Sequence, residues 1–321
     1  MNSVLVTGAG GFVGRWLVRT LLDRGYAVTG ALQQGAALEP GMLSDSERAA
    51  VRWIGLELLD SDSVRRVLRG PYDSVVHLAA VSSGADARQH PGNAWAVNAA
   101  GTARILEVTA QQKHAGLSDP LILLASTGEV YGAKATTPLR ETDPVRPCSP
   151  YAASKAGAEL AAMETSGRTG LKVIVARPFQ QAGPGQDDRF VLPALAKRLR
   201  GARLAGARVI KVGNLEPVRD FLDVRDVCDA LLGLLESGTP GEVYNIATGH
   251  GIRLEELFQT FASVVGVDAI AEVDPELMRP ADIPYLVGDA SKLRKQTGWS
   301  PRIDLKQTIA DVVAWQANEP R

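Results

Sequence analysis

Apolar and polar residues follow two patterns that take turns along the first half of the chain. Short apolar runs rich in β-branched residues predict buried parallel strands at residues 3–7, 27–32, 51–56, 74–78, 121–125 and 172–176. Helices are predicted between them at residues 12–24, 61–68, 94–112 and 150–166. Because strands and helices alternate, we predict an α/β fold of the Rossmann type, a doubly wound parallel sheet with right-handed crossovers.

The pattern is looser after Pro178, where loops surround a predicted helix at residues 191–201. Further predictions are helices at residues 224–236 and 305–317 and a strand at residues 242–246. Earlier in the chain, residues 35–47 are the segment that we expect to be a flexible loop.

A chain of 321 residues is long enough for two domains, or for one large domain with an appended lobe. We predict a dinucleotide-binding domain formed by residues 1–178 together with about 224–250. Residues 179–223 and 251–321 are predicted to form a smaller C-terminal α/β domain that binds the substrate.

Composition excludes several classes of function. The 35 Lys and Arg residues balance 36 Asp and Glu residues, which argues against a nucleic-acid-binding surface. The two cysteines lie in unrelated contexts and the four histidines lack metal-ligand spacing, so we expect no disulfide framework and no metal site. The sequence has no apolar run of about 18 residues and no signal peptide at its start, so we expect a cytoplasmic protein without a membrane segment.

A glycine-rich turn joins the first predicted strand to the first predicted helix. Gly8, Gly11 and Gly14 are spaced three apart, so the backbone can turn tightly and bring helix N–H groups close to a pyrophosphate. A turn without a ligand is the alternative, but its place at the first strand–helix junction favours a dinucleotide cofactor. At the end of the second strand, Gln33 and Gln34 stand where an acid would select NAD or an arginine NADP. We expect NADP or NAD, and the absence of a carboxylate there favours NADP.

Two short motifs carry candidate catalytic groups. Tyr151 and Lys155 lie four residues apart on a predicted helix, so the ammonium is expected to lower the pKa of the phenol from about 10 for acid–base work. Ser126, Thr127 and Glu129 follow the fifth strand, at the edge of the sheet where ligands bind. Thr127 can hydrogen-bond a sugar or keto oxygen, and Glu129 is a second candidate acid or base. The alternatives are a surface Tyr–Lys pair, helix or turn capping, and a solvated loop carboxylate.

Over nearly its whole length the chain resembles the extended short-chain dehydrogenase/reductase family, in the branch that acts on nucleotide sugars. Within that branch its C-terminal half is most similar to GDP-4-keto-6-deoxy-D-mannose reductases and GDP-mannose 4,6-dehydratases. The resemblance rests on TGAGGFVG (7–14), HLAA (77–80), VNAAGT (97–102), STGEVYG (126–132), YAASK (151–155), ARPFQQAGPGQ (176–186), GNLEPVRDFLDVRDV (213–227), YNIATG (244–249), RPADIPYLVGD (279–289) and GW (298–299).

The resemblance implies a role for each matching residue. Tyr151 would be the general acid or base, Lys155 would hold the nicotinamide ribose, and Thr127 would bind the sugar 4-oxygen. The implied cofactor-binding residues are Gly8, Gly11, Phe12, Val13, Gly14, Gln33, Glu57, Leu58, Leu78, Ala79, Ala80, Tyr151, Lys155 and Pro178, with Glu57 replacing the usual Asp. The implied substrate-binding residues are Ser126, Gln180, Val191, Arg219 and Arg279, of which the two arginines would hold the substrate diphosphate.

Departures from the family pattern bear on the reaction. The triplet Thr127-Gly128-Glu129 keeps the Thr and Glu of the dehydratases but not the middle residue, and glutamines replace the paired arginines of their cofactor loop. Gln180 replaces an Asn that contacts the substrate phosphate region. We expect a 4-ketoreductase that uses NAD(P)H on a GDP-linked 4-keto-6-deoxy sugar. The alternatives are a dehydratase or epimerase that recycles its cofactor, and a binding protein that has lost turnover.

Association with a second copy is also expected. The predicted helices at residues 94–112 and 150–166 carry alanine-rich faces, and in this family the two helices form a four-helix dimer interface. The alternative is that these faces pack inside one molecule. The expected partners are therefore a nucleotide-diphosphate sugar and a second copy of the chain.

Overall fold

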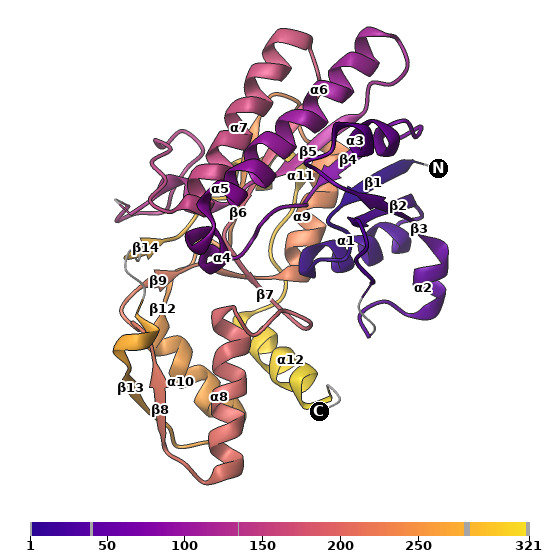
Figure 1. Cartoon of the computed structure of the whole chain (residues 1–321). Coiled ribbons are helices and arrows are strands. Elements are labelled where there is room, and N and C mark those ends of the chain that lie inside the picture. The colour runs from indigo at the N-terminus through magenta and orange to yellow at the C-terminus, as the bar shows by residue number, and fades with distance from the viewer. Residues whose placement is uncertain (1, 39–40, 134, 279–282, 319–321) are drawn as a thin grey trace.

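The sheet at the centre of the molecule follows the predicted pattern. The computed structural model describes residues 2–38, 41–133, 135–278 and 283–318. Within these residues the chain forms a seven-stranded sheet in the order β11-β6-β5-β4-β1-β2-β3, with every pair parallel (Figure 1). Its strands are β1 (Ser3–Thr7), β2 (Ala27–Gln33), β3 (Arg52–Leu56), β4 (Ser74–His77), β5 (Leu121–Ala125), β6 (Val173–Pro178) and β11 (Val243–Ile246). The order reverses between β1 and β4, which places a ligand crevice at their carboxyl ends.

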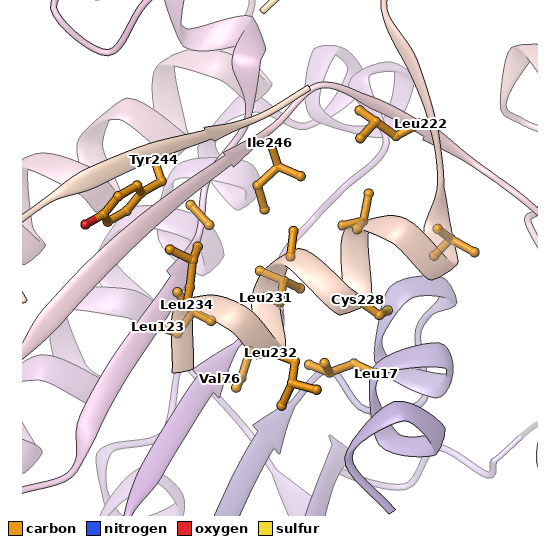
Figure 2. Close-up of a cluster of buried hydrophobic side chains, with 14 of the residues drawn as sticks. Leu17, Val76, Leu123, Leu222, Cys228, Leu231, Leu232, Leu234, Tyr244 and Ile246 are labelled. Carbon is orange, nitrogen blue, oxygen red and sulfur yellow. The ribbon is translucent and has the colours of Figure 1, made fainter. Parts of the chain in front are cut away.

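Helices cover both faces of this sheet, which confirms the Rossmann-type fold. On one face, α1 (Phe12–Asp23) packs against α9 (Val224–Ser237); on the other, α6 (Gly101–His114) lies between α3 (Ser61–Leu68) and α7 (Pro150–Thr169). Side chains alternate between the two cores, because successive strand residues point to opposite faces. Figure 2 shows the first core, where Leu17 of α1 and Leu231 of α9 meet Val76, Leu123 and Ile246 of the sheet. Leu5 and Val75 point instead into the core beneath α3 and α6.

Three local features differ from the prediction. The helix expected at residues 94–112 begins earlier, at α5 (Pro91–Trp95), and contains a π-helical turn, η1 (Ala96–Ala100), before α6. The segment expected to be a loop at residues 35–47 runs into α2 (Asp45–Ala50), which has a capping box between Ser44 and Glu47. A short helix, α4 (Gly84–Gln89), follows β4 and was not predicted.

The rest of the second half forms a lobe at the lower end of the molecule in Figure 1. Its helices α8 (Val191–Ala205), α10 (Leu254–Val265) and α12 (Leu305–Asn318) share a separate hydrophobic cluster that includes Leu199, Phe258 and Ile309. Short strands complete it: β7 (Gln180–Ala182) with β10 (Phe221–Asp223), β8 (Val209–Val212) with β13 (Ile270–Val273), and β9 (Val218–Arg219) between β12 (Ile252–Arg253) and β14 (Tyr285–Leu286).

Three further short helices complete the elements of the described residues: η2 (Gly128–Tyr131) after β5, η3 (Pro275–Leu277) after β13 and α11 (Ser291–Thr297) after β14. Leu293 of α11 and Trp299 pack into the core beneath α9 rather than into the lobe. The division of the chain into two domains stays a prediction. Among the described residues, no helix is long and apolar enough to cross a membrane.

Candidate active site

A cavity of about 1480 Å³ lies at the carboxyl ends of the central strands, between the sheet and the C-terminal lobe. Nearly all of the site residues predicted from the sequence line it. They are Gly8, Gly11, Phe12, Val13, Gly14, Gln33, Glu57, Leu58, Leu78, Ala79, Ala80, Ser126, Thr127, Glu129, Tyr151, Lys155, Pro178, Gln180 and Val191. Arg219 is not among the lining residues; its guanidinium donates to the carbonyl oxygen of Val218 at 3.0 Å. Arg279 lies outside the described residues.

The glycine turn is shaped so that side chains would block it. Gly8 has a φ of +70°, and a Cβ there would lie 2.8 Å from the backbone nitrogen of Ala79. A Cβ on Gly14 would lie 2.2 Å from the carbonyl oxygen of Gly8. Gly11 begins α1 without a side-chain cap, so the N–H groups of the first helical turn are left for a ligand. This cradle fits the pyrophosphate of a dinucleotide.

The ends of β1 and β4 are joined through side chains next to this turn. Thr7 Oγ1 lies 2.7 Å from His77 Nδ1 and accepts a hydrogen bond from the backbone N–H of Ala79 at 3.2 Å. His77 Nε2 lies 3.0 Å from Thr102 Oγ1. Burial, and then the charge of Lys155, lower the pKa of His77 to about 3, so the ring is neutral. These contacts hold residues 78–80 against Gly8, where a cofactor would pass.

The far end of the cavity is formed by the residues after β2 and β3. Gln33 is exposed at the end of β2. Glu57 Oε1 accepts a hydrogen bond from the N–H of Leu59 at 3.0 Å, so this carboxylate shapes the turn that leads into α3. Leu58 is buried beside it. The end of β2 carries neither the acid nor the arginine that would separate NAD from NADP.

Tyr151 lies in the first turn of α7, which begins at a well-defined cap. Ser149 Oγ accepts a hydrogen bond from the N–H of Ala152 at 3.1 Å, and Pro150 occupies the first helical position. The hydroxyl of Tyr151 is hydrogen-bonded to the side chain of Thr127, whose Oγ1 also accepts from the N–H of Glu129 at 3.2 Å. Three groups predicted from two separate motifs are thus brought together.

The electrostatics of Tyr151 differ from the expectation. Burial, followed by the negative charge of Glu129, raises the pKa of Tyr151 above its ordinary value, and the hydrogen bond with Thr127 opposes this only in part. The expected lowering of this pKa by Lys155 is wrong. The phenol of this structure is therefore protonated throughout the neutral range.

Lys155 itself is buried, with 4% of its surface exposed. Burial lowers the pKa of Lys155 to about 8, and the negative charge of Glu159 opposes the shift. Glu159 in turn is held by Arg177 and Ser126, in a buried cluster that the sequence analysis missed. The sequence does contain a signal for this cluster. Arg177 is a charged residue that directly follows the apolar run at residues 173–176.

Asn98 is a second residue whose role was not predicted from the sequence, although it lies in the motif VNAAGT. The π-helical turn turns its side chain toward α7, where its Nδ2 donates to Ser154 Oγ at 2.9 Å. Its Oδ1 accepts from the N–H of Val81 at 2.8 Å, and its Nδ2 also donates to the carbonyl oxygen of Val81 at 3.1 Å. Asn98 therefore ties the loop after β4 to the helix that carries Tyr151 and Lys155.

Glutamine side chains line the cavity on the side that faces the C-terminal lobe. Within the described residues, the side-chain oxygens of Gln180, Gln181, Gln186 and Gln316 are buried in the cavity wall and accept no hydrogen bond. The amide nitrogens of Gln186 and Gln316 donate to the carbonyl oxygens of Gln181 and Pro193, both at 2.9 Å, which fixes the direction of their oxygens. A buried acceptor without a partner costs about 1–3 kcal/mol. The four glutamines give this side of the cavity uncharged, polar side chains.

Among the described residues, no three His, Cys, Asp or Glu side chains gather in a way that could hold a metal ion.

Comparison with known proteins agrees with this geometry. The family model described as GDP-mannose 4,6 dehydratase matches residues 5–312. The chain belongs to this family, which places it among the NAD(P)-dependent extended short-chain dehydrogenase/reductase enzymes that modify nucleotide sugars.

Particular relatives act at different steps on such sugars. The chain is 34% identical over 265 residues to the GDP-6-deoxy-D-mannose reductase of Pseudomonas aeruginosa, a match that covers 81% of this chain and 86% of that protein. The structure of RMD from Pseudomonas aeruginosa complexed with NADPH has a TM-score of 0.83 at 30% identity, covering 99% of both chains. The UDP-glucose 4-epimerase of Thermus thermophilus complexed with NAD has a TM-score of 0.85 at 30% identity, covering 99% of this chain and 100% of that one.

Proposed function

We propose that the protein is a nucleotide-sugar 4-ketoreductase that reduces GDP-4-keto-6-deoxy-D-mannose with NAD(P)H. The observation that carries the proposal is the hydrogen-bonded pair of Tyr151 and Thr127 in the cavity that also contains the glycine cradle. A phenol that stays protonated at neutral pH suits a reaction that must deliver a proton to a ketone oxygen. The similarity to a GDP-6-deoxy-D-mannose reductase supports this direction of reaction.

Each residue then has a defined part in the reduction. Bound NAD(P)H supplies the hydride to the sugar C4. Tyr151 donates its hydroxyl proton to the C4 oxygen, while Thr127 donates a hydrogen bond that orients the same oxygen. The ammonium of Lys155 holds the hydroxyls of the cofactor ribose and stabilises the phenolate that is left behind. Gly8, Gly11 and Gly14 leave room for the cofactor pyrophosphate.

The substrate would lie along the wall formed by β7 and α8. Gln180 and the other glutamines that line this side of the cavity support a polar substrate. Val191 begins α8, so its backbone N–H is free to bind a diphosphate oxygen. Ser126 lies at the same edge, but its hydroxyl donates to Glu159, so we assign it a supporting place beside the sugar.

A second candidate is a 4,6-dehydratase, and one specific observation favours it. The negative charge of Glu129 raises the pKa of Tyr151, so a carboxylate lies near the acid–base phenol. A carboxylate in that place could remove a proton from the sugar ring after oxidation at C4. The two candidates differ in whether the cofactor is consumed.

Net consumption of the cofactor distinguishes these reactions. Purified protein is expected to oxidise NADPH or NADH when it is given GDP-4-keto-6-deoxy-D-mannose, which is followed through the loss of nicotinamide absorbance. Comparison of kcat/KM for the two cofactors then measures their preference, which we propose to be for NADPH. Failure to turn over any nucleotide-linked 4-keto sugar would exclude the reductase. Conversion of GDP-mannose without net change in bound cofactor would establish the dehydratase.

We also propose that α6 and α7 form the interface of a homodimer. Ala152, Ala156 and Ala158, expected on the interface, are instead buried within the molecule, so the outer side of α7 is left for a partner. Leu160 and Met163 are exposed on that side, by 73% and 42%. Light scattering should give twice the chain mass of 34.1 kDa, and Leu160→Arg should return it to one mass. A wild-type protein of single mass at micromolar concentration would refute the dimer.

A further inference from the structure

The buried cluster behind the catalytic helix is an unusually complete ion pair. Arg177 Nε donates to Glu159 Oε1 at 3.0 Å and its Nη2 donates to Oε2 at 2.6 Å, so the pair is bidentate. Both side chains are less than 10% exposed. Ser126 Oγ donates to the same Oε1, so the carboxylate of Glu159 receives donors from β6 and from the residue that follows β5. We call these three residues the Glu159 cluster.

The cluster is anchored on its far side to the C-terminal half of the chain. Arg177 Nη1 donates to Tyr131 Oη at 2.8 Å, and the guanidinium lies 4.8 Å from the centre of the Tyr131 ring. Tyr131 Oη donates to Asn245 Oδ1 at 2.8 Å, and Asn245 Nδ2 donates to the carbonyl oxygen of Leu139 at 2.9 Å. Four side chains from separate elements therefore fix the position of one carboxylate.

That carboxylate lies one helical turn from Lys155, while its direct ion pair is with Arg177. Residues four apart on a helix share a face, so Glu159 lies one turn beyond Lys155 on α7, as Tyr151 lies one turn before it. Lys155 is almost fully buried, and its ammonium loses the hydration that would keep it charged. A fixed negative charge one turn away favours the charged form of a buried ammonium.

The other ionisable groups around Lys155 do not take this part. His77, on β4, is neutral, with its pKa lowered to about 3 by burial and by the charge of Lys155. Glu129, on η2, acts on Tyr151 at the other end of the face. Arg177, on β6, is positively charged and forms its ion pair with Glu159. The charge of Glu159 is the one that favours the ammonium of Lys155.

We propose that Glu159 is a positioning residue for Lys155: the Glu159 cluster fixes a negative charge one helical turn from the buried ammonium and keeps it charged. The proposal rests on the reductase function for its consequence in catalysis, because Lys155 is the lysine of that mechanism. Its physical content is independent of turnover, since the protonation of Lys155 is measurable in the protein alone.

The test is the titration of Lys155 by NMR in the full chain labelled with ¹³C-lysine, with its signal assigned through Lys155→Met. The variant E159Q/R177Q removes both charges of the pair and keeps two hydrogen-bonding side chains, so it leaves no uncompensated buried charge. We expect its Lys155 to titrate at least about one pH unit lower than in the wild type. In Glu159→Asp the charge remains but withdraws by one methylene, so the shift should be in the same direction and smaller.

The matched control is E164Q/R168Q, which removes the exposed pair of Glu164 and Arg168 from the same helix. It should leave the titration of Lys155 unchanged. A titration of Lys155 that is the same in wild type and in either Glu159 variant overturns the proposal. If the double variant does not fold, the Glu159→Asp comparison decides. Failure of the reductase assay with a clear shift of Lys155 would refute the proposed function and leave this inference standing.

Discussion

Tyr151→Phe should lower the rate of ketone reduction by about 10²–10⁴-fold, the range in which general acid catalysis contributes. The substitution removes the hydroxyl that is hydrogen-bonded to Thr127 and keeps the ring that fills the cavity wall. Affinity for NADPH, measured by fluorescence, should change by less than about threefold, because the glycine cradle and Lys155 remain. Loss of kcat with retained cofactor affinity is the pattern expected for a group that acts on the reacting oxygen.

A matched control is Tyr26→Phe, which removes a phenol that lies within 3.4 Å of Glu236 at the edge of the molecule. It should retain the wild-type rate. A Tyr151→Phe enzyme with more than about a tenth of wild-type activity would mean that another group, Glu129 or water, delivers the proton. Circular dichroism of both variants shows whether a loss of activity comes from loss of the fold.

The raised pKa of Tyr151 also predicts how the reduction depends on pH. A proton donor works while it holds its proton, and burial and Glu129 keep the phenol protonated above its ordinary titration range. Lys155, with a pKa of about 8, is the group whose deprotonation is expected first as the pH rises. A decline in activity above about pH 8 would therefore be assigned to Lys155 rather than to Tyr151, which Lys155→Arg tests by moving the decline upward.

The parallel sheet and the glycine cradle were predictable from the sequence because each depends on local chemistry. Strands buried on both faces need continuous apolar runs, and these runs mark β1 through β6 closely. A Cβ at Gly8 or Gly14 would lie less than 3 Å from neighbouring backbone atoms, so only glycine fits at these two positions. Motifs far apart in sequence meet in one cavity because the carboxyl ends of parallel strands share an edge.

Other features could not be predicted because they depend on contacts between distant segments. The short strands of the C-terminal lobe, such as β9 and β12, are two residues long and exist only through their pairing. The π-helical turn at Asn98 covers only five residues within a longer helical segment. The pKa of Tyr151 was predicted in the wrong direction because spacing on a helix gives the neighbour Lys155 but neither the burial of the phenol nor the approach of Glu129.

Arg177→Gln is expected to destabilise the protein by about 3–5 kcal/mol, the cost of leaving a buried charge without its partner. Glu159 would keep the hydrogen bond from Ser126 but would lose the two that the guanidinium donates. Tyr131 would lose the donor at its hydroxyl. Urea unfolding followed by tryptophan fluorescence measures the loss as a lower midpoint at an unchanged slope. This charge lies in the centre of the molecule, so the effect should exceed that of any exposed pair.

The double variant E159Q/R177Q separates the cost of an unpaired charge from the value of the pair. If the single variant is unstable because Glu159 is left charged and buried, removing that charge as well should restore part of the stability. The double variant should then be more stable than Arg177→Gln by at least about 1 kcal/mol, although it has lost both ions. Equal losses in the two variants would mean that the packing of the arginine against Tyr131, and not the charge, stabilises this region.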